Sequence, residues 1–337
     1  MKRSLNILFL ISIVGCSEKP VQEPLASGHV PPNSVEINQS VLGEELRKAR
    51  LKSLEACLWP KEGGFRDPRL DSRSRCDIVP AEKAAFDLGE LALPVLQKAL
   101  LDDEVKERQG WAARMIATIG GEQARHILQS VFQESGDLLG LLCFAMSSTG
   151  TKADERFLIN TIQSEVDVDN WWEIDAAALS LGVLRSEAAK EALSELATKE
   201  KRGILSSTAA RSLEWIENGE WNVPQIANAN ERDEVILSMF RCGIPRSEES
   251  EVFYEEANDR IWKRSDRAWQ FEPIDAEHPQ RGAPKLYFNV FITQDRERAL
   301  ARVEIYFDMM NASGFLYTLR KNDEQWKVSG ILFEWIS

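Results

Sequence analysis

The sequence predicts an α-solenoid of helix pairs followed by a small α+β domain with a curved antiparallel sheet. Two patterns of apolar residues support this prediction. Between residues 81 and 220 they recur at helical spacing in units of 28 to 35 residues, and after residue 285 they alternate with a period of two. A chain of 337 residues, 43% hydrophobic and 28% charged, is long enough for two folded domains.

Composition excludes several functional classes. The formal charge of -13 argues against a nucleic-acid-binding protein, because such proteins draw their affinity from Lys and Arg side chains that neutralise phosphates. The five Cys and three His include no C-x-x-C or H-x-x-x-H spacing, which argues against a zinc or haem site. We therefore expect no cofactor and no metal.

The amino end has the features of an export signal. Lys2 and Arg3 precede an apolar run over residues 5–14, which is too short to cross a bilayer because a spanning helix needs about 20 residues. The run ends in Ile13-Val14-Gly15-Cys16. This ending resembles the lipobox of bacterial lipoproteins, in which the Cys becomes the first residue of the mature chain.

The lipobox resemblance implies a lipid anchor on Cys16. It implies a diacylglyceryl thioether on the sulfur and an acyl chain, such as palmitate, on the amine; two or more chains anchor stably where one does not. Ser17 follows in place of Asp, which in the enterobacterial sorting rule implies the outer membrane, with the protein facing the periplasm. Residues 1–15 are then the signal peptide. Residues 16–40 are predicted as a flexible tether because they contain Pro20, Pro24, Pro31 and Pro32.

Residues 41–80 are predicted as a capping helix and a loop. The helix covers residues 42–58, and the loop at residues 60–77 lies between Cys57 and Cys76. An exported protein can form a disulfide between these two residues because its compartment is oxidising. Pairing cannot be deduced from sequence, so the bridged and the reduced forms both remain open.

The region 81–220 contains a repeated pattern: small-small-x-x-aliphatic-small-x-apolar. Each copy forms one apolar face of a helix, and a second amphipathic helix follows most copies, so each unit is a helix pair and the series is an α-solenoid. Cys143 falls on a core position of its copy. The copies begin at Ala84, Ala112, Leu142, Ala177 and Ala209, and the second helices are predicted at residues 93–101, 124–132, 155–163 and 188–197.

This pattern resembles the short HEAT-like repeats related to phycobilisome lyases. In other units Leu138, Glu173 and Leu205 stand where the family pattern has Arg, so the resemblance implies the fold and no bilin-lyase activity. The second unit matches best, through Pro94, Leu96, Leu100, Asp103, Arg108, Ala112, Ala113, Ile116, Ile119 and Gly120.

Residues 221–337 are predicted as the α+β domain. A helix over residues 231–241 should cover one face of an antiparallel meander whose turns lie at residues 311–314 and 321–324. The other face should be exposed, because it carries Arg302, Glu304, Asp308 and Arg320. The apolar face is formed by Leu286, Phe288, Val290, Ile292, Ala301, Val303, Ile305, Phe307, Phe315, Tyr317, Leu319, Trp326, Val328, Ile331, Phe333 and Trp335.

A helix followed by a curved sheet resembles the cystatin-like cone of the nuclear-transport-factor-two-like superfamily. The tail, with Tyr317-Thr318-Leu319, Trp326-Lys327-Val328 and Trp335-Ile336-Ser337, is similar to that of uncharacterised bacterial domains of this kind. Cones of this kind sometimes hold a ligand cavity. Here the interior positions are apolar and include no acid and no His, so a filled core is the favoured interpretation.

One segment outside these patterns is a candidate contact with a partner. Trp171 and Trp172 stand among acids that include Glu173 and Asp175, and Trp is enriched at interface hot spots. A calcium loop over residues 165–175 is disfavoured, because it lacks the Gly at position six and the bidentate Glu at position twelve.

We expect a non-catalytic scaffold, adaptor or assembly factor that binds another envelope protein. No G-x-S-x-G motif is present, and Ser206-Ser207 has no local base. Two alternatives remain open. One is an envelope enzyme or small-ligand binder that uses the cone cavity, and the other is a periplasmic immunity lipoprotein that inhibits a toxin.

Overall fold

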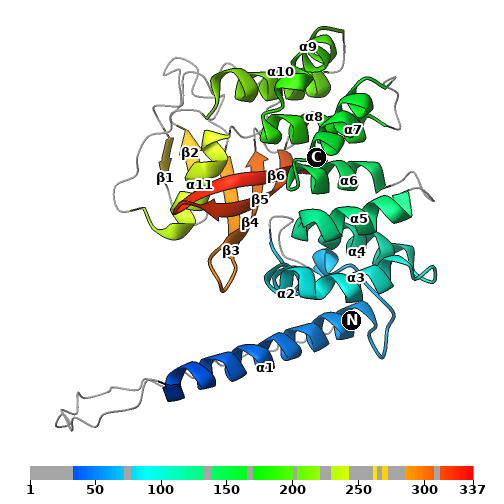
Figure 1. Ribbon diagram of the computed structural model, residues 1–337, viewed down its shortest axis with the longest axis vertical. Helices are drawn as coiled ribbons and strands as arrows, with labels where there is room; N and C mark the ends of the chain where they lie inside the picture. Colours follow the sequence, from blue (N-terminus) through cyan, green and yellow to red (C-terminus); the bar gives the residue numbers. More distant parts are fainter. Residues whose placement is uncertain are drawn as a thin grey trace, which may run out of the picture. The chain divides into compact units, whose positions relative to one another are not determined.

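The computed structural model describes residues 33–71, 77–132, 138–164, 170–199, 203–220, 229–242, 261–263, 268–271, 285–306 and 312–336. The chain divides into two units after residue 45, and residues 46–337 form the second unit, to which the following description applies. Within it a helical region precedes an antiparallel sheet, which confirms the predicted order (Figure 1).

The described helices form the helical region and, with the last of them, cover one face of the sheet. The first begins earlier than predicted, so residues 33–40, predicted as tether, are helical. The helices are α1 (Asn33–Leu58), α2 (Pro80–Leu88), α3 (Leu93–Leu100), α4 (Lys106–Ile119), α5 (Gly121–Phe132), α6 (Leu139–Ser147), α7 (Lys152–Ile162), α8 (Trp171–Leu184), α9 (Lys190–Lys199), α10 (Gly203–Asn218) and α11 (Glu231–Arg241), with the short 3-10 turns η1 (Pro68–Asp71), η2 (Gly89–Ala92) and η4 (Glu187–Ala189).

Local chemistry sets where several helices begin and end. At the start of α7, the hydroxyl of Thr151 accepts the Asp154 N–H at 3.1 Å, and the Asp154 carboxylate accepts the Thr151 N–H at 3.2 Å. This reciprocal pair satisfies two backbone donors that have no partner within the helix. Gly120 ends α4 with a φ of 65°, a conformation that side chains with a Cβ rarely adopt.

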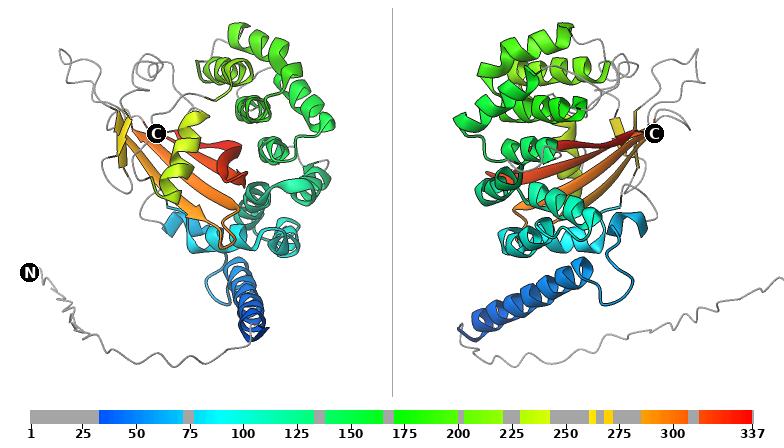
Figure 2. Two further views of the ribbon diagram at one scale, coloured as in Figure 1. Left: turned by 60° about the vertical axis from the view of Figure 1, so that its left-hand side comes forward. Right: turned by 90° about the vertical axis from the view of Figure 1, so that its right-hand side faces the viewer.

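The helices pack in two rows. In one row α4 lies against α6, α6 against α8, and α8 against α10, while α3, α5, α7 and α9 each pack beside a helix of that row (Figure 2). The small residues of the repeat pattern occupy the contacts, since Ala112, Ala113, Ala177, Ala178 and Ala209 are buried. Cys143 is also fully buried, as its core position predicted.

The sheet is a simple meander in which every neighbouring pair of strands is antiparallel. Two short strands precede those that the alternation predicted. The strands are β1 (Ile261–Lys263), β2 (Ala268–Phe271), β3 (Lys285–Ile292), β4 (Arg298–Tyr306), β5 (Ala312–Asn322) and β6 (Gln325–Ile336), in that spatial order. The predicted turn at residues 321–324 is present, and Asp323 and Glu324 both have positive φ.

Helix α11 covers one face of the sheet, as predicted. Its Phe240 ring packs edge-on against Phe288 of β3, with ring centroids 5.7 Å apart. Two side chains of the helix also donate to strand carbonyls: Arg232 to Phe288 at 3.1 Å and Ser238 to Trp326 at 2.7 Å. Apolar burial and these hydrogen bonds together fix the helix on the sheet.

The prediction that the opposite face is exposed is wrong. Arg302 and Glu304 of β4 are buried, with exposed fractions of 1% and 4%. Leu300, Leu316 and Leu332 on this face belong to the same apolar core as the helices α2 to α10. The helices therefore cover the face that was predicted to be exposed from its polar residues. Figure 2 shows the sheet on the inner side of the curved row of helices. Asp308 lies outside the described residues.

Strand β6 contains two irregularities that the alternation did not reveal. Its apolar residues change phase between Val328 and Ile331, as they would at a strand boundary. The strand continues there, because Ser329 is an extra residue between the pairs Leu319–Val328 and Thr318–Gly330. Glu334 is a second extra residue, because Phe333 and Trp335 on either side of it pair with two consecutive residues of β5.

Gly330 lies where β6 approaches α6 closely, so its substitution tests this packing. A Cβ at this position would lie 2.6 Å from the Phe144 ring of α6 and 2.9 Å from the Ser147 hydroxyl. We expect Gly330→Ala to lower the free energy of unfolding by about 1 to 3 kcal/mol in chemical denaturation, because the site has no room.

The matched control is Gly110→Ala in α4, where a Cβ would meet nothing within 4 Å. It should raise the free energy of unfolding by about 0.5 to 1 kcal/mol, because Ala favours a helix interior. Equal stability of Gly330→Ala and the parent chain would contradict close packing of β6 on α6.

Candidate functional site

The cysteines predicted to carry a lipid or a disulfide are only partly described. Cys16 and Cys76 lie outside the described residues. Cys57, on α1, is a half-buried free thiol. Burial raises the pKa of this thiol, and the nearby negative charge of Asp67 raises it further. A bridge between Cys57 and Cys76 therefore stays a prediction.

The four residues predicted to contact a partner do not form an exposed patch. Trp171 packs against Phe333 of β6, with ring centroids 5.9 Å apart, and Trp172 lies against Gly140 of α6. Glu173 and Asp175 are buried, with exposed fractions of 8% and 3%. The prediction missed this arrangement because α8 is enclosed by α6, α10 and β6, so polar residues of its first turns point into the protein.

Asp175 is a buried acid whose environment favours the protonated form. The Thr208 hydroxyl of α10 donates to its carboxylate at 2.6 Å. Burial raises the pKa of Asp175 to about 7, and this hydrogen bond opposes the rise. The residue therefore takes up a proton on folding over much of the neutral and mildly acidic range.

A network of buried charges joins the helical region to the sheet. The Arg302 guanidinium of β4 donates to both carboxylate oxygens of Glu82 in α2, at 3.0 and 3.2 Å, and its Nε lies 2.8 Å from Glu334 of β6. It also donates to the Asp77 carbonyl at 2.6 Å. Arg114 of α4 pairs with Glu334 from the other side.

The network is closed to substrates. Arg302 is 1% exposed and Glu82 is 0% exposed, so a dissolved molecule cannot reach either group in this conformation. Burial, together with the positive charges of Arg69 and Arg302, lowers the pKa of Arg114. Guanidinium and carboxylate groups alternate through the network, which compensates each buried charge. We interpret it as the joint between helices and sheet.

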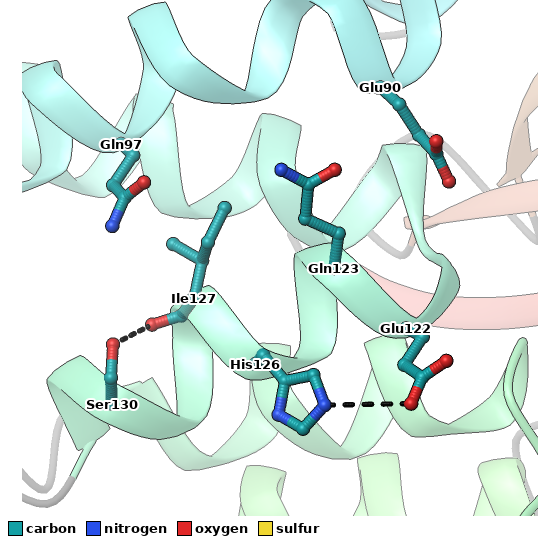
Figure 3. Close-up of a pocket in the computed structure, with 7 residues that line it drawn as sticks. All are labelled: Glu90, Gln97, Glu122, Gln123, His126, Ile127 and Ser130. Atoms are coloured by element: carbon teal, nitrogen blue, oxygen red, sulfur yellow. Dashed lines mark hydrogen bonds and ion pairs between the residues drawn. The ribbon is translucent and has the colours of Figure 1, made fainter.

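An open groove of about 520 Å³ lies between α3 and α5. Figure 3 shows Gln97 of α3 and Glu90 of η2 along one side and side chains of α5 along the other. None of the lining residues that the structure describes belongs to the sheet. They are Glu90, Gln97, Glu122, Gln123, His126, Ile127 and Ser130.

The groove combines carboxylates, amides and an apolar floor. Glu122 is 81% exposed and lies 3.6 Å from His126, one helical turn away. The Ser130 hydroxyl donates to the Ile127 carbonyl at 2.8 Å, so it is held by its own helix. Ile127 is almost fully buried beneath these polar groups. This set suits recognition of a polar segment, and we find in it no activated nucleophile.

Two smaller cavities offer less space for a ligand. One of about 130 Å³ lies where the last turns of α8 and α10 meet β6, with Arg185 paired to Glu220 at 3.2 Å on its rim. Another, beside Phe144 and Arg298, holds only about 10 Å³. Within the described ranges, no three His, Cys, Asp or Glu residues are arranged to hold a metal ion. Nor does any described helix have the length and apolar character of a membrane span.

Sequence reasoning missed the groove because its two sides come from different helices. Glu122, His126 and Ser130 are spaced four residues apart, so a helix over residues 121–132 places them on one face. That spacing was readable in the sequence. The position of Gln97 opposite them depends on how α3 packs on its neighbours, which no local pattern encodes.

Comparison with known proteins does not assign the chain. No protein-family model, no curated protein and no solved structure matches it.

Replacing Arg302 tests the buried network. We expect Arg302→Met to lower the free energy of unfolding by about 3 to 5 kcal/mol in urea denaturation, because Glu82 and Glu334 lose a common buried partner. Arg185→Met is the control, since the Arg185–Glu220 pair is exposed and should contribute less than about 1 kcal/mol. Similar losses for both variants would contradict the joint.

The raised pKa of Asp175 predicts how the stability of the protein depends on pH. Between the unfolded pKa near 4 and the folded value of about 7, the folded state binds the extra proton, so stability falls as pH rises through this window. The slope should approach about 1.4 kcal/mol per pH unit. Asp175→Asn keeps the acceptor for Thr208 without a charge, and should be more stable than the parent at pH 8. Parallel stability curves for the two chains from pH 5 to 8 would contradict this assignment.

Proposed function

We propose that this chain is a lipid-anchored envelope protein that binds a protein partner through the groove between α3 and α5 and catalyses no reaction of its own. The observation that carries the proposal is this groove, with amides that make no hydrogen bond to the described residues, above the apolar side chain of Ile127. Its lining side chains are supplied by an ordered helical frame, so a partner would meet a preformed surface.

The anchoring part of the proposal rests on the amino-terminal sequence. A charged start, a short apolar run and Gly15-Cys16 together are typical of a lipoprotein signal. The acylated Cys16 would hold the protein at the inner leaflet of the outer membrane, facing the periplasm. The bilayer is then a second partner, contacted through the acyl chains.

The proposal treats α2 to α10 as a HEAT-like solenoid, and repeated contacts support this. The Ser180 hydroxyl of α8 donates to the Cys143 carbonyl of α6 at 2.9 Å, and the Ser212 hydroxyl of α10 donates to the Ala178 carbonyl of α8 at 2.8 Å. Ser180 and Ser212 occupy the same position in their repeats, as do the two acceptors. Equivalent residues therefore make equivalent bonds between successive units.

The proposed location of the binding surface follows from the position of the sheet, which covers one side of the helical region. Stacked repeats commonly bind partners on their concave side. Here β6 lies against α6 and α8, and the Ser147 hydroxyl of α6 donates to the Ser329 carbonyl of β6 at 2.8 Å. A partner would therefore need another surface, and the α3–α5 groove lies away from β6.

The alternative functions receive less support. A cone cavity would require space between α11 and the sheet, but Phe240, Phe288, Val303 and Tyr317 pack there with exposed fractions of at most 4%. No observation bears on inhibition of a toxin.

Site-specific crosslinking in native envelopes tests the proposal. A photoreactive residue replaces Gln123 in the groove or, as the control, Glu191 on the exposed side of α9. We expect one adduct of defined mass from position 123 and none from position 191. The adduct should be lost in a Cys16→Ser chain, which lacks the anchor and its membrane position.

Labelling of equal strength from both positions, or recovery of this chain alone, would contradict the proposal. Unfolding curves of the two photoreactive variants must match that of the parent, so that a missing adduct reports on binding and not on misfolding.

A further inference from the structure

We propose that the α3–α5 groove binds an extended segment that carries a Lys or Arg beside an apolar side chain. This inference rests on the proposed function and specifies the chemistry of the partner. Four features of the groove support it, and each limits the type of ligand that would fit.

The first feature is charge. Glu90 enters the groove from η2 and Glu122 from α5, and the described lining residues include no Lys and no Arg. The nearby Arg298 donates to the Asp87 carbonyl at 3.3 Å, and its positive charge interacts with Asp295 as well as with Glu90. The two carboxylates therefore favour a cationic group and repel phosphates, which disfavours nucleic acid.

The second feature is a pair of amides. In Figure 3, Gln97 and Gln123 lie on either side of the Ile127 side chain. Within the described part of the chain, neither side-chain amide makes a hydrogen bond. Each amide offers both a donor and an acceptor, which match the N–H and C=O of a peptide backbone.

The third feature follows from those amides. A helix uses its backbone N–H and C=O groups internally, whereas an extended segment leaves them free for side chains of a partner. The amide pair therefore favours an extended segment over a helical one.

The fourth feature is exposed apolar surface at both ends of α3. Leu91 is 55% exposed and Leu101 is 56% exposed, the two highest values among the large apolar residues described. Leu101 follows the end of α3, and its backbone N–H donates to the Gln97 carbonyl one helical turn earlier, at 3.0 Å. An apolar side chain of a partner that extends past Gln97 would bury Leu101.

Selection from an unbiased library of displayed short peptides tests this inference on the full lipidated chain in detergent. We expect the selected peptides to be enriched in Lys or Arg next to Leu, Ile, Val or Phe. Their affinity should fall about tenfold, which equals about 1.4 kcal/mol, in the double variant Glu90→Gln, Glu122→Gln. It should also weaken as salt is raised, because exposed charges are screened.

A matched control removes the same charge elsewhere. Glu191→Gln combined with Glu217→Gln alters two exposed acids of α9 and α10 and should leave affinity unchanged. Gln97→Ala combined with Gln123→Ala should weaken every selected peptide, whatever its charge, because it removes the backbone contacts.

The outcomes separate this inference from the proposed function. Peptides that depend on Gln97 and Gln123 but carry no excess of Lys or Arg would overturn the basic ligand and leave groove binding intact. Peptides that bind the double glutamate variant and the parent equally would do the same. Selected peptides that are insensitive to both groove variants would overturn the groove as the binding surface, and with it both proposals.

Discussion

The guanidinium of Arg302 is the group on which the arrangement of residues 46–337 depends. It comes from the middle of β4 and satisfies carboxylates from α2 and β6, Glu82 and Glu334, which lie far apart in sequence. A charge with this little exposure is tolerated only when its partners are held in place, so each part of the network requires the others. Helices and sheet are therefore joined by a polar contact with defined geometry as well as by apolar burial, and an alternative docking of the sheet would leave these charges unpaired.

This joint determines which surfaces remain available. Because β6 lies against α6 and α8 on the inner side of the helical row, that side is used for contacts within the chain. The α3–α5 groove is formed by the helical region, and none of its described lining residues belongs to the sheet. Binding would then depend on the stability of the joint only through the rigidity of the helices. Substitutions in the groove should therefore change partner binding, whereas substitutions in the joint should change the free energy of unfolding.

The irregularities of β6 show where local pattern stops being informative. Alternation correctly identified the apolar residues on both sides of Ser329, but one unpaired residue shifts the phase, and a shift of phase is also what a strand boundary produces. Similarly, Arg302 and Glu304 alternate with apolar residues as an exposed face would. The sequence of a strand does not determine whether one of its polar residues faces water or a buried partner of opposite charge, because the partner lies in another element.

The sequence by itself determined the succession of helices, the helix that covers the sheet, and the strands from residue 285 onward. These follow from the spacing of apolar residues, which each segment carries locally. It also contains the lipobox-like ending at Cys16. Only the tertiary structure decided that the helices cover the second face of the sheet, that Trp171 and Asp175 point inward, and that Gln97 stands opposite α5. Such relations depend on contacts between elements distant in the chain, and neither periodicity nor composition encodes them.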